Sequence, residues 1–228
     1  MPAAPTISII EAMADPNIWQ PWFRNADNWT GWRAFLKALF GLPLSAAELA
    51  LFTQCTGLAA PPEGGLTEAW LVVGRRGGKS LILALVAVYL AIFRDWSAYL
   101  QPGETGFIKI LAVDRKQALV IMRYARALIV EVKLLRSLLA NDDRWTLELT
   151  TGLAIEVQTA SFRSTRGFTL IGALCDEIAF WRSDETSANP DAEILAALRP
   201  AMSTIPGAML LCASSPYARR GDLIARLF

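Results

Sequence analysis

A glycine-rich segment that ends in a lysine and a hydroxyl carries the clearest chemical pattern of the sequence. Gly74-Arg75-Arg76-Gly77-Gly78 is followed directly by Lys79 and Ser80. The residues before it, 69–73, are apolar and predict a buried strand, and the 13 apolar residues after it, 81–93, predict a buried helix. The order strand, glycine-rich turn and helix is typical of a loop that binds phosphate groups.

The expected role of each loop residue follows from this order. Glycines let backbone N–H groups close around an anion, and the helix N-terminus adds a partial positive charge. We expect Lys79 to contact the β- and γ-phosphates of a nucleotide and Ser80 to bind Mg²⁺, with the phosphates surrounded by Gly74, Arg75, Arg76, Gly77 and Gly78. The first glycine stands one residue later than in the pattern G-x-x-x-x-G-K-[ST], so the alternative is a glycine-rich turn before an ordinary helix.

Two carboxylates follow a second apolar run. Residues 169–175 predict a strand, and Asp176 and Glu177 come directly after it. Ligands bind at the carboxyl ends of parallel strands, so Asp176 is expected to hold Mg²⁺ beside the phosphate loop. Glu177 is expected to orient or deprotonate the water that attacks the γ-phosphate. The alternative is that both residues cap the next helix.

Two hydroxyls follow a third apolar run. Residues 209–213 predict a strand that ends in Ser214 and Ser215 before a proline. In many nucleoside triphosphatases such a strand lies between the phosphate-loop strand and the acidic strand. Ser214 and Ser215 would then lie under the γ-phosphate and sense its loss, whereas the alternative is a simple turn at the end of a strand.

Arginines are the candidates for stabilising charge in the transition state of phosphoryl transfer. Arg75 lies inside the phosphate loop, and Arg163 and Arg166 lie in a short polar segment before the acidic strand. Arg166 would act from its own subunit or from a neighbouring one. A solvated loop position is the alternative for each of them.

The order of the expected elements indicates an α/β fold. From residue 67 onward strands and helices alternate, apart from one hairpin at residues 145–158, which predicts a mainly parallel sheet with helices on both faces. A long helix is expected over residues 115–139. Its basic residues would contact DNA or form a solvated face, and the solvated face is the simpler interpretation for Lys116, Arg123, Arg126 and Lys133. Residues 1–66 are expected to form a helical, tryptophan-rich segment that packs on the core formed by residues 67–228.

Composition excludes several classes of site. The chain of 228 residues has a net charge of +1, so any contact with nucleic acid needs a local basic patch. It contains no histidine, which excludes histidine-based metal sites and Ser-His-Asp triads. The three cysteines have no metal-ligand spacing. The longest apolar run is too short to span a bilayer, which needs about 20 helical residues, and no membrane partner is expected.

The three motifs together resemble those of large terminase subunits, the DNA-packaging motors of tailed bacteriophages. The phosphate loop with Arg75 four residues before Lys79, the acidic strand ending in Asp176-Glu177 and the Ser214-Ser215 coupling motif all match. The resemblance implies a P-loop NTPase fold of the RecA-like type. It also implies hydrolysis of ATP with Mg²⁺, driving double-stranded DNA into a procapsid in the host cytoplasm. The implied partners are a portal protein, a small terminase subunit and further copies of this chain in a ring.

The resemblance leaves some functions open. Large terminases usually carry a ribonuclease-H-like nuclease domain after the ATPase domain, and this sequence ends soon after the third motif. We therefore expect the nuclease domain to be absent and no DNA cleavage from this chain. The alternatives are another P-loop nucleic-acid motor, such as a helicase, and an assembly module that binds nucleotide without turnover.

Overall fold

The structure is a computed structural model, which describes residues 7–159, 167–181 and 190–216. The chain divides into two compact units. The smaller comprises Pro5–Ala69, and the main part of the larger begins at Trp70. The division falls within strand β1 (Glu68–Val72).

The described part of the smaller unit is helical. Both α1 and α3 begin with a capping box, in which a serine and a glutamate three residues later each satisfy the other's backbone N–H. Lys37 of α2 also pairs with Glu48 of α3 at 2.7 Å, and the indole of Trp19 is fully buried. The elements are α1 (Ile9–Ala14), η1 (Gln20–Trp22), η2 (Ala26–Trp29), α2 (Thr30–Leu39) and α3 (Ala46–Thr56).

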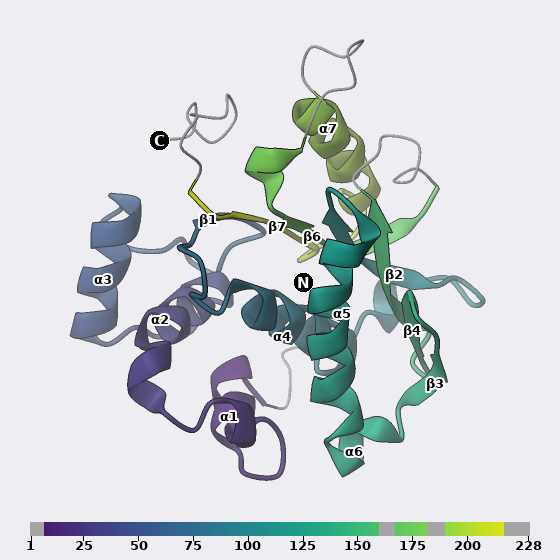
Figure 1. Cartoon of the computed structure of the whole chain (residues 1–228), viewed down its shortest axis with the longest axis horizontal. Coiled ribbons are helices and arrows are strands. Elements are labelled where there is room, and N and C mark those ends of the chain that lie inside the picture. Colours follow the sequence, from purple (N-terminus) through teal and green to yellow (C-terminus); the bar gives the residue numbers. More distant parts are fainter. Residues whose placement is uncertain (1–6, 160–166, 182–189, 217–228) are drawn as a thin grey trace. The chain divides into compact units, whose positions relative to one another are not determined.

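The larger unit is built on one sheet, which in the described residues has seven strands in the order β1-β7-β6-β2-β5-β4-β3 (Figure 1). Strands β7, β6, β2 and β5 are parallel, and β4 and β3 extend the sheet as an antiparallel edge. The predicted mainly parallel α/β fold is therefore confirmed. Strand β7 lies between β1 and β6, as the third motif predicts.

The bounds of these elements agree closely with the apolar runs of the sequence. After β1 come α4 (Lys79–Ile92), η3 (Ser97–Tyr99), β2 (Gly106–Ala112), α5 (Arg115–Val130), α6 (Lys133–Arg136), β3 (Leu139–Asp142), β4 (Thr146–Leu149) and β5 (Leu153–Thr159). They are followed by β6 (Thr169–Asp176), η5 (Ile178–Phe180), α7 (Pro190–Met202) and β7 (Met209–Ser214).

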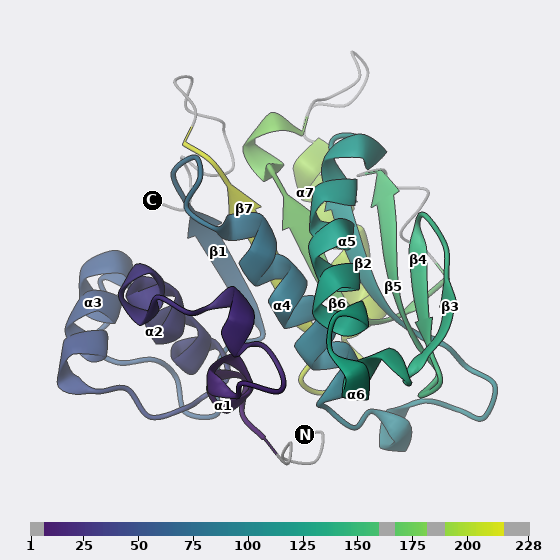
Figure 2. The same ribbon diagram turned by 60° about the horizontal axis from the view of Figure 1, so that its bottom comes forward.

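Helices flank the sheet on both faces. Helices α4 and α5 lie side by side on one face, and α7 lies on the other (Figure 2). Residues 82–91 of α4 are all buried, whereas α5 buries a single stripe from Ala118 to Ile129. Among the described residues no helix is long and apolar enough to cross a membrane.

The predicted helix over residues 115–139 is wrong at its C-terminal end. Helix α5 ends at Val130, Val132 has an extended backbone, and Leu139 begins β3. The apolar spacing does not reveal this break because Val132 and Leu135 are also buried. The strand forms because Leu139–Asp142 pairs with β4 across a short turn, an interaction that the apolar spacing does not reveal.

A buried ion pair joins β2 to β5. Lys109 is fully buried and lies opposite Glu156 in the parallel register, with Nζ 2.7 Å from Oε2. The rings of Phe107 and Phe168 lie 4.4 and 3.5 Å from the same ammonium. A one-residue slip would leave a buried charge without its partner, so this pair helps to fix the register of the central strands.

Candidate functional site

The glycine-rich loop forms a tight turn between β1 and α4. The backbone of Gly78 is left-handed (φ 84°), and so is that of Arg76 (φ 63°). The N–H of Gly77 donates to the carbonyl of Gly74 at 3.1 Å. A Cβ atom at Gly77 would lie 2.6 Å from Val73 Cγ1 and 3.0 Å from the Gly74 carbonyl oxygen, so the turn requires glycine there.

Replacing Gly77 by alanine is expected to destabilise the protein, because the added methyl group overlaps Val73 Cγ1 and crowds the Gly74 carbonyl oxygen. We expect Gly77→Ala to lower the free energy of unfolding by about 1–3 kcal/mol, the usual cost of overpacking. The control is Gly74→Ala, because a Cβ there meets no atom within 4 Å. Urea denaturation checks both variants, and equal stability would contradict the described turn.

The loop places the N-terminus of α4 where an anion can approach it. The N-cap residue is Gly78, which has no side chain to accept hydrogen bonds from the first turn. The first N–H to bond back along the helix is that of Ile82, to the carbonyl of Gly78 at 3.1 Å. The N–H groups of residues 79–81 precede this ladder and are suited to phosphate oxygens.

Lys79 brings the phosphate loop and the acidic strand together. Its ammonium lies 2.6 Å from Glu177 Oε1 and 3.0 Å from Asp176 Oδ1. All three side chains are largely shielded, with 9%, 25% and 8% of Lys79, Glu177 and Asp176 exposed. Lys79, which follows the phosphate loop, and the two carboxylates at the end of β6 therefore form one ionic cluster.

The two carboxylates differ in their protonation properties. Burial raises the pKa of Asp176, and attraction to Lys79 offsets only part of this effect. Burial also acts to raise the pKa of Glu177, but hydrogen bonds from Lys79 and Ser215 outweigh it, so this pKa lies below its ordinary value. Glu177 is therefore ionised at neutral pH and can accept a proton.

Ser214, the last residue of β7, and Ser215 after it both contact Glu177. Asp176 lies opposite Ala213 in the parallel register, which brings the next residues of the two strands together. Glu177 Oε2 accepts from the N–H of Ser215 at 2.9 Å and from Ser214 Oγ at 3.2 Å, and Oε1 accepts from Ser215 Oγ at 3.0 Å. The hydrogen bonds from the two serine hydroxyls thus orient the Glu177 carboxylate.

Removal of the Ser215 hydroxyl is expected to reduce turnover without weakening nucleotide binding. Ser215→Ala leaves the backbone N–H but removes one of the bonds that lower the pKa of Glu177. A base is active when ionised, so we expect the acidic limb of the pH–rate profile to move to higher pH and kcat to fall about tenfold, with KM for ATP unchanged.

The control for this variant is Ser137→Ala. The Ser137 hydroxyl donates to a backbone carbonyl, that of Leu134, at 2.8 Å on an exposed surface. Steady-state kinetics between pH 5 and 8 check the prediction. An unshifted acidic limb for Ser215→Ala would indicate that Ser215 does not position Glu177.

A residue missed by the sequence reasoning, Trp181, holds the turn after β6. Its indole is buried, and Nε1 donates to the backbone carbonyl of Asp176 at 2.9 Å. Glu177 itself has a left-handed backbone (φ 50°), which is unfavourable for a residue other than glycine. Trp181 therefore helps to keep the two carboxylates in place. The only sign of this role in the sequence is that an aromatic residue follows Asp176-Glu177 closely.

The predicted arginines are not part of this cluster. The side chains of Arg75 and Arg76 are exposed, and they form no ion pair with a described residue. Exposure leaves both guanidiniums accessible to an anion in the loop. Arg163 and Arg166 lie outside the described residues.

The cluster fits a divalent cation held jointly with a nucleotide. Asp176 Oδ1 is buried and lies 3.0 Å from the Lys79 ammonium, without a well-aligned hydrogen-bond donor among the described residues. Ser80 stands in the first turn of α4 and supplies a hydroxyl oxygen. Among the described residues no group of three acidic, cysteine or histidine side chains could hold a metal alone. One carboxylate and one hydroxyl suit Mg²⁺, which usually takes one or two protein ligands, phosphate oxygens and water.

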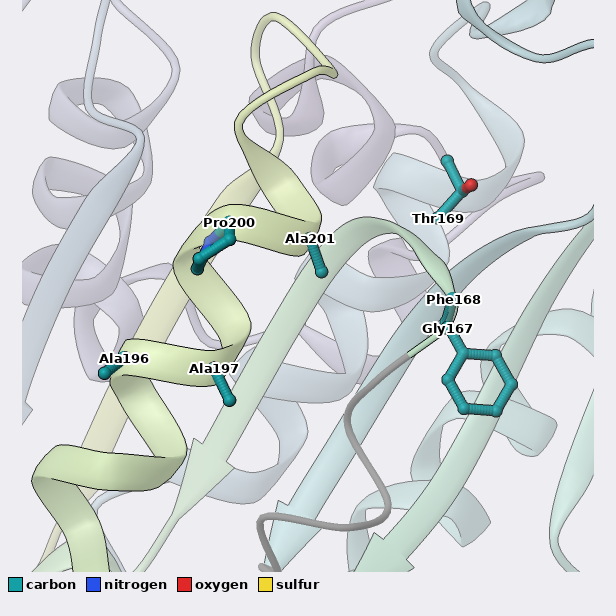
Figure 3. A pocket seen from close by; sticks show the side chains of 7 residues that line it. All are labelled: Gly167, Phe168, Thr169, Ala196, Ala197, Pro200 and Ala201. Atoms are coloured by element: carbon teal, nitrogen blue, oxygen red, sulfur yellow. The ribbon is translucent and has the colours of Figure 1, made fainter.

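A separate groove lies at the other end of β6. It has a volume of about 640 Å³ and runs between the start of β6 and α7, from which Ala197 and Ala201 project toward the strand (Figure 3). Its lining is Gly167, Phe168, Thr169, Ala196, Ala197, Pro200 and Ala201. Because Thr169 begins the strand that Asp176 ends, this groove is distinct from the ionic cluster.

Comparison with known proteins supports the fold assignment. No family model and no curated protein matches the sequence. The solved large terminase of bacteriophage HK97 is similar in structure, with a TM-score of 0.56 and 21% identity over 86% of this chain and 40% of that one. The fold is that of a large terminase ATPase domain. The large terminase ATPase domain of Thermus phage P74-26 is also similar, with a TM-score of 0.50 and 18% identity over 81% of this chain and 70% of that domain.

The terminase fold agrees with the position of the ionic cluster at the carboxyl end of the sheet. In α/β proteins of this architecture, ligands bind at the carboxyl ends of the strands. The chain spans 40% of the length of the HK97 terminase.

Proposed function

We propose that this chain is the ATPase domain of a phage large terminase subunit and that it hydrolyses ATP with Mg²⁺. The observation that carries the proposal is the joint contact of Lys79 with Asp176 and Glu177 where the phosphate loop meets the acidic strand. A structural ion pair would need only one carboxylate. Two carboxylates with opposite pKa shifts suit a division of labour between metal binding and proton transfer.

Each residue of the cluster has a defined role in this proposal. The N–H groups at the start of α4 bind phosphate oxygens, and Lys79 exchanges its carboxylate partners for the β- and γ-phosphates. Ser80 and Asp176 hold Mg²⁺, which neutralises phosphate charge when bound. Glu177, oriented by Ser214 and Ser215, accepts the proton of the attacking water. Arg75 stabilises the charge that develops on the phosphate, or Arg166 does so from its own or a neighbouring subunit.

The proposed biological role is translocation of double-stranded DNA into a procapsid in the host cytoplasm. The partners proposed for this role are a portal protein, a small terminase subunit and further copies of this chain in a ring. Ser214 and Ser215 would couple hydrolysis to movement, because they connect β7 directly to Glu177. The fold shared with the terminases of HK97 and P74-26 supports this role.

Phosphate release measured with and without duplex DNA tests the proposal. We expect Mg²⁺-dependent release from ATP that rises with protein concentration and with duplex DNA. Tight nucleotide binding without any release under these conditions would favour an assembly module. Stimulation by single-stranded DNA alone would favour a helicase-like motor.

A further inference from the structure

Two arginines and a tryptophan form an exposed cluster on the larger unit. The guanidinium carbon of Arg115 lies 5.3 Å from the ring centroid of Trp145, and that of Arg144 lies 4.7 Å from the same ring. Both arginines are exposed and the indole is half-buried. The two positive charges are therefore at most about 10 Å apart. We call Arg115, Arg144 and Trp145 the basic cluster.

The carboxylates nearest in sequence are already engaged in local bonds. Asp114 accepts from the N–H of Gln117 as the N-cap of α5, at 2.9 Å. Asp143 accepts from the N–H groups of Trp145 and Thr146 within its own turn.

Asp142 pairs instead with Arg126, at 2.7 Å. Within the described residues, Arg115 and Arg144 thus form no ion pair, and neither does the neighbouring Lys116. Like charges held this close, with no ion pair to a described carboxylate, favour the approach of an anion.

The basic cluster lies at the same edge of the sheet as the ionic cluster. Arg115 follows the carboxyl end of β2, and Leu111 of β2 lies opposite Cys175, next to Asp176. The carbonyl of Trp145 accepts from Val157 N at 2.9 Å, near the carboxyl end of β5. A polymer bound at the basic cluster would thus lie along the same carboxyl edge of the sheet as the proposed site of hydrolysis. It would lie beside β2 and β5, whereas that site is at the end of β6.

We infer that the basic cluster binds the phosphate backbone of duplex DNA, an inference that rests on the proposed action on DNA. Duplex DNA carries one negative charge per about 1.7 Å of its axis, so two guanidiniums within 10 Å can contact neighbouring phosphates. The indole already makes cation–π contacts with both guanidiniums. It orients them and is not a free platform for unpaired bases, which favours a duplex over a single strand. With a net charge of +1, the chain needs such a local patch.

The test compares two doubly substituted variants with the same loss of charge. One is Arg115→Ala with Arg144→Ala. The control is Arg123→Ala with Lys133→Ala, which removes two exposed charges from α5 and α6. Arg123 lies about 12 Å from Arg115 along the axis of α5, and Lys133 follows the end of that helix. Fluorescence anisotropy with a 30-base-pair duplex, repeated across salt concentrations, gives the affinity and its salt dependence.

We expect the Arg115/Arg144 variant to bind the duplex about tenfold more weakly at 0.1 M salt. The slope of log affinity against log salt should shrink in magnitude by about two, one for each lost phosphate contact. The control variant should retain the wild-type affinity within about twofold. Arg115→Lys with Arg144→Lys keeps both charges and should recover most of the affinity.

Several results would overturn the inference. The control variant could lose as much affinity for duplex DNA as the Arg115/Arg144 variant, or the lysine variant could fail to recover that affinity. The wild type could also bind single-stranded DNA more tightly than duplex DNA, or not bind duplex DNA at all. The affinity of each variant for a non-hydrolysable ATP analogue, measured in parallel, separates this inference from the proposed function. A loss of DNA affinity confined to the Arg115/Arg144 variant supports the basic cluster even if the wild type fails to bind ATP. ATP hydrolysis without duplex binding would refute the cluster but leave the nucleotide site standing.

Discussion

Lys79→Ala is expected to abolish nucleotide binding. The lysine supplies the buried side-chain charge at the end of the loop, and in the proposed complex it contacts two phosphates. A hydrogen bond to a charged group contributes about 1.5–3 kcal/mol, so the loss of two such contacts should weaken binding at least ~10²-fold. Calorimetry with a non-hydrolysable ATP analogue and Mg²⁺ measures this change.

The same substitution removes the cation that lies between two carboxylates. Asp176 and Glu177 would then repel each other, and the raised pKa of Asp176 should rise further. A variant that fails to bind could therefore simply be unfolded. Lys79→Met retains most of the alkyl stem, and circular dichroism identifies the variants that remain folded. Unchanged affinity in a folded Lys79→Met protein would contradict the phosphate-loop assignment.

The parts of the site that the sequence predicted are those formed by contiguous residues. Strand, loop and helix around Lys79 follow one another directly, and the apolar runs before Asp176 and Ser214 end where β6 and β7 end. The position of β7 between β1 and β6 was predictable from the general order of strands in such proteins. In a parallel sheet the carboxyl ends of the strands lie at one edge, where ligands bind. Three motifs that each follow a strand therefore predict one site.

Features that depend on strand pairing, or on side-chain contacts outside the motifs, were not predictable in this way. The hydrogen bond from Trp181 to the Asp176 carbonyl depends on the 3₁₀ turn after β6, where a helix was the alternative considered. The buried pair of Lys109 and Glu156 depends on the register of β2 against β5. Strand β3 escaped prediction for the same reason, since its partner β4 determines its conformation.

The sequence alone does not show which basic residues are available to contact DNA. Arg126 is engaged by Asp142 and by the carbonyl of Asp143, so it belongs to the β3–β4 turn rather than to a free helix face. Arg144 is not distinguished in the sequence, because nothing in its own segment connects it to α5. Only the folded chain brings it to the same indole as Arg115.

Glu177→Gln is expected to stop turnover while nucleotide still binds. The amide retains the shape of the side chain but cannot accept the proton of the attacking water. General bases contribute about 10²–10⁴-fold, so we expect phosphate release to fall at least ~10²-fold. Because Glu177 holds Lys79 at 2.6 Å, its neutralisation also frees the ammonium for phosphate. The variant should therefore bind an ATP analogue no more weakly than the wild type.

The control for this substitution is Glu148→Gln, an exposed glutamate on β4, which should leave both binding and turnover unchanged. Quenched-flow measurement of phosphate release, with analogue binding measured on the same samples, separates the two effects. A folded Glu177→Gln protein that keeps turnover within a few-fold of the wild type would exclude Glu177 as the base. A loss of turnover matched by an equal loss of affinity would instead give Glu177 a structural role, that of holding Lys79 and the two serines in place.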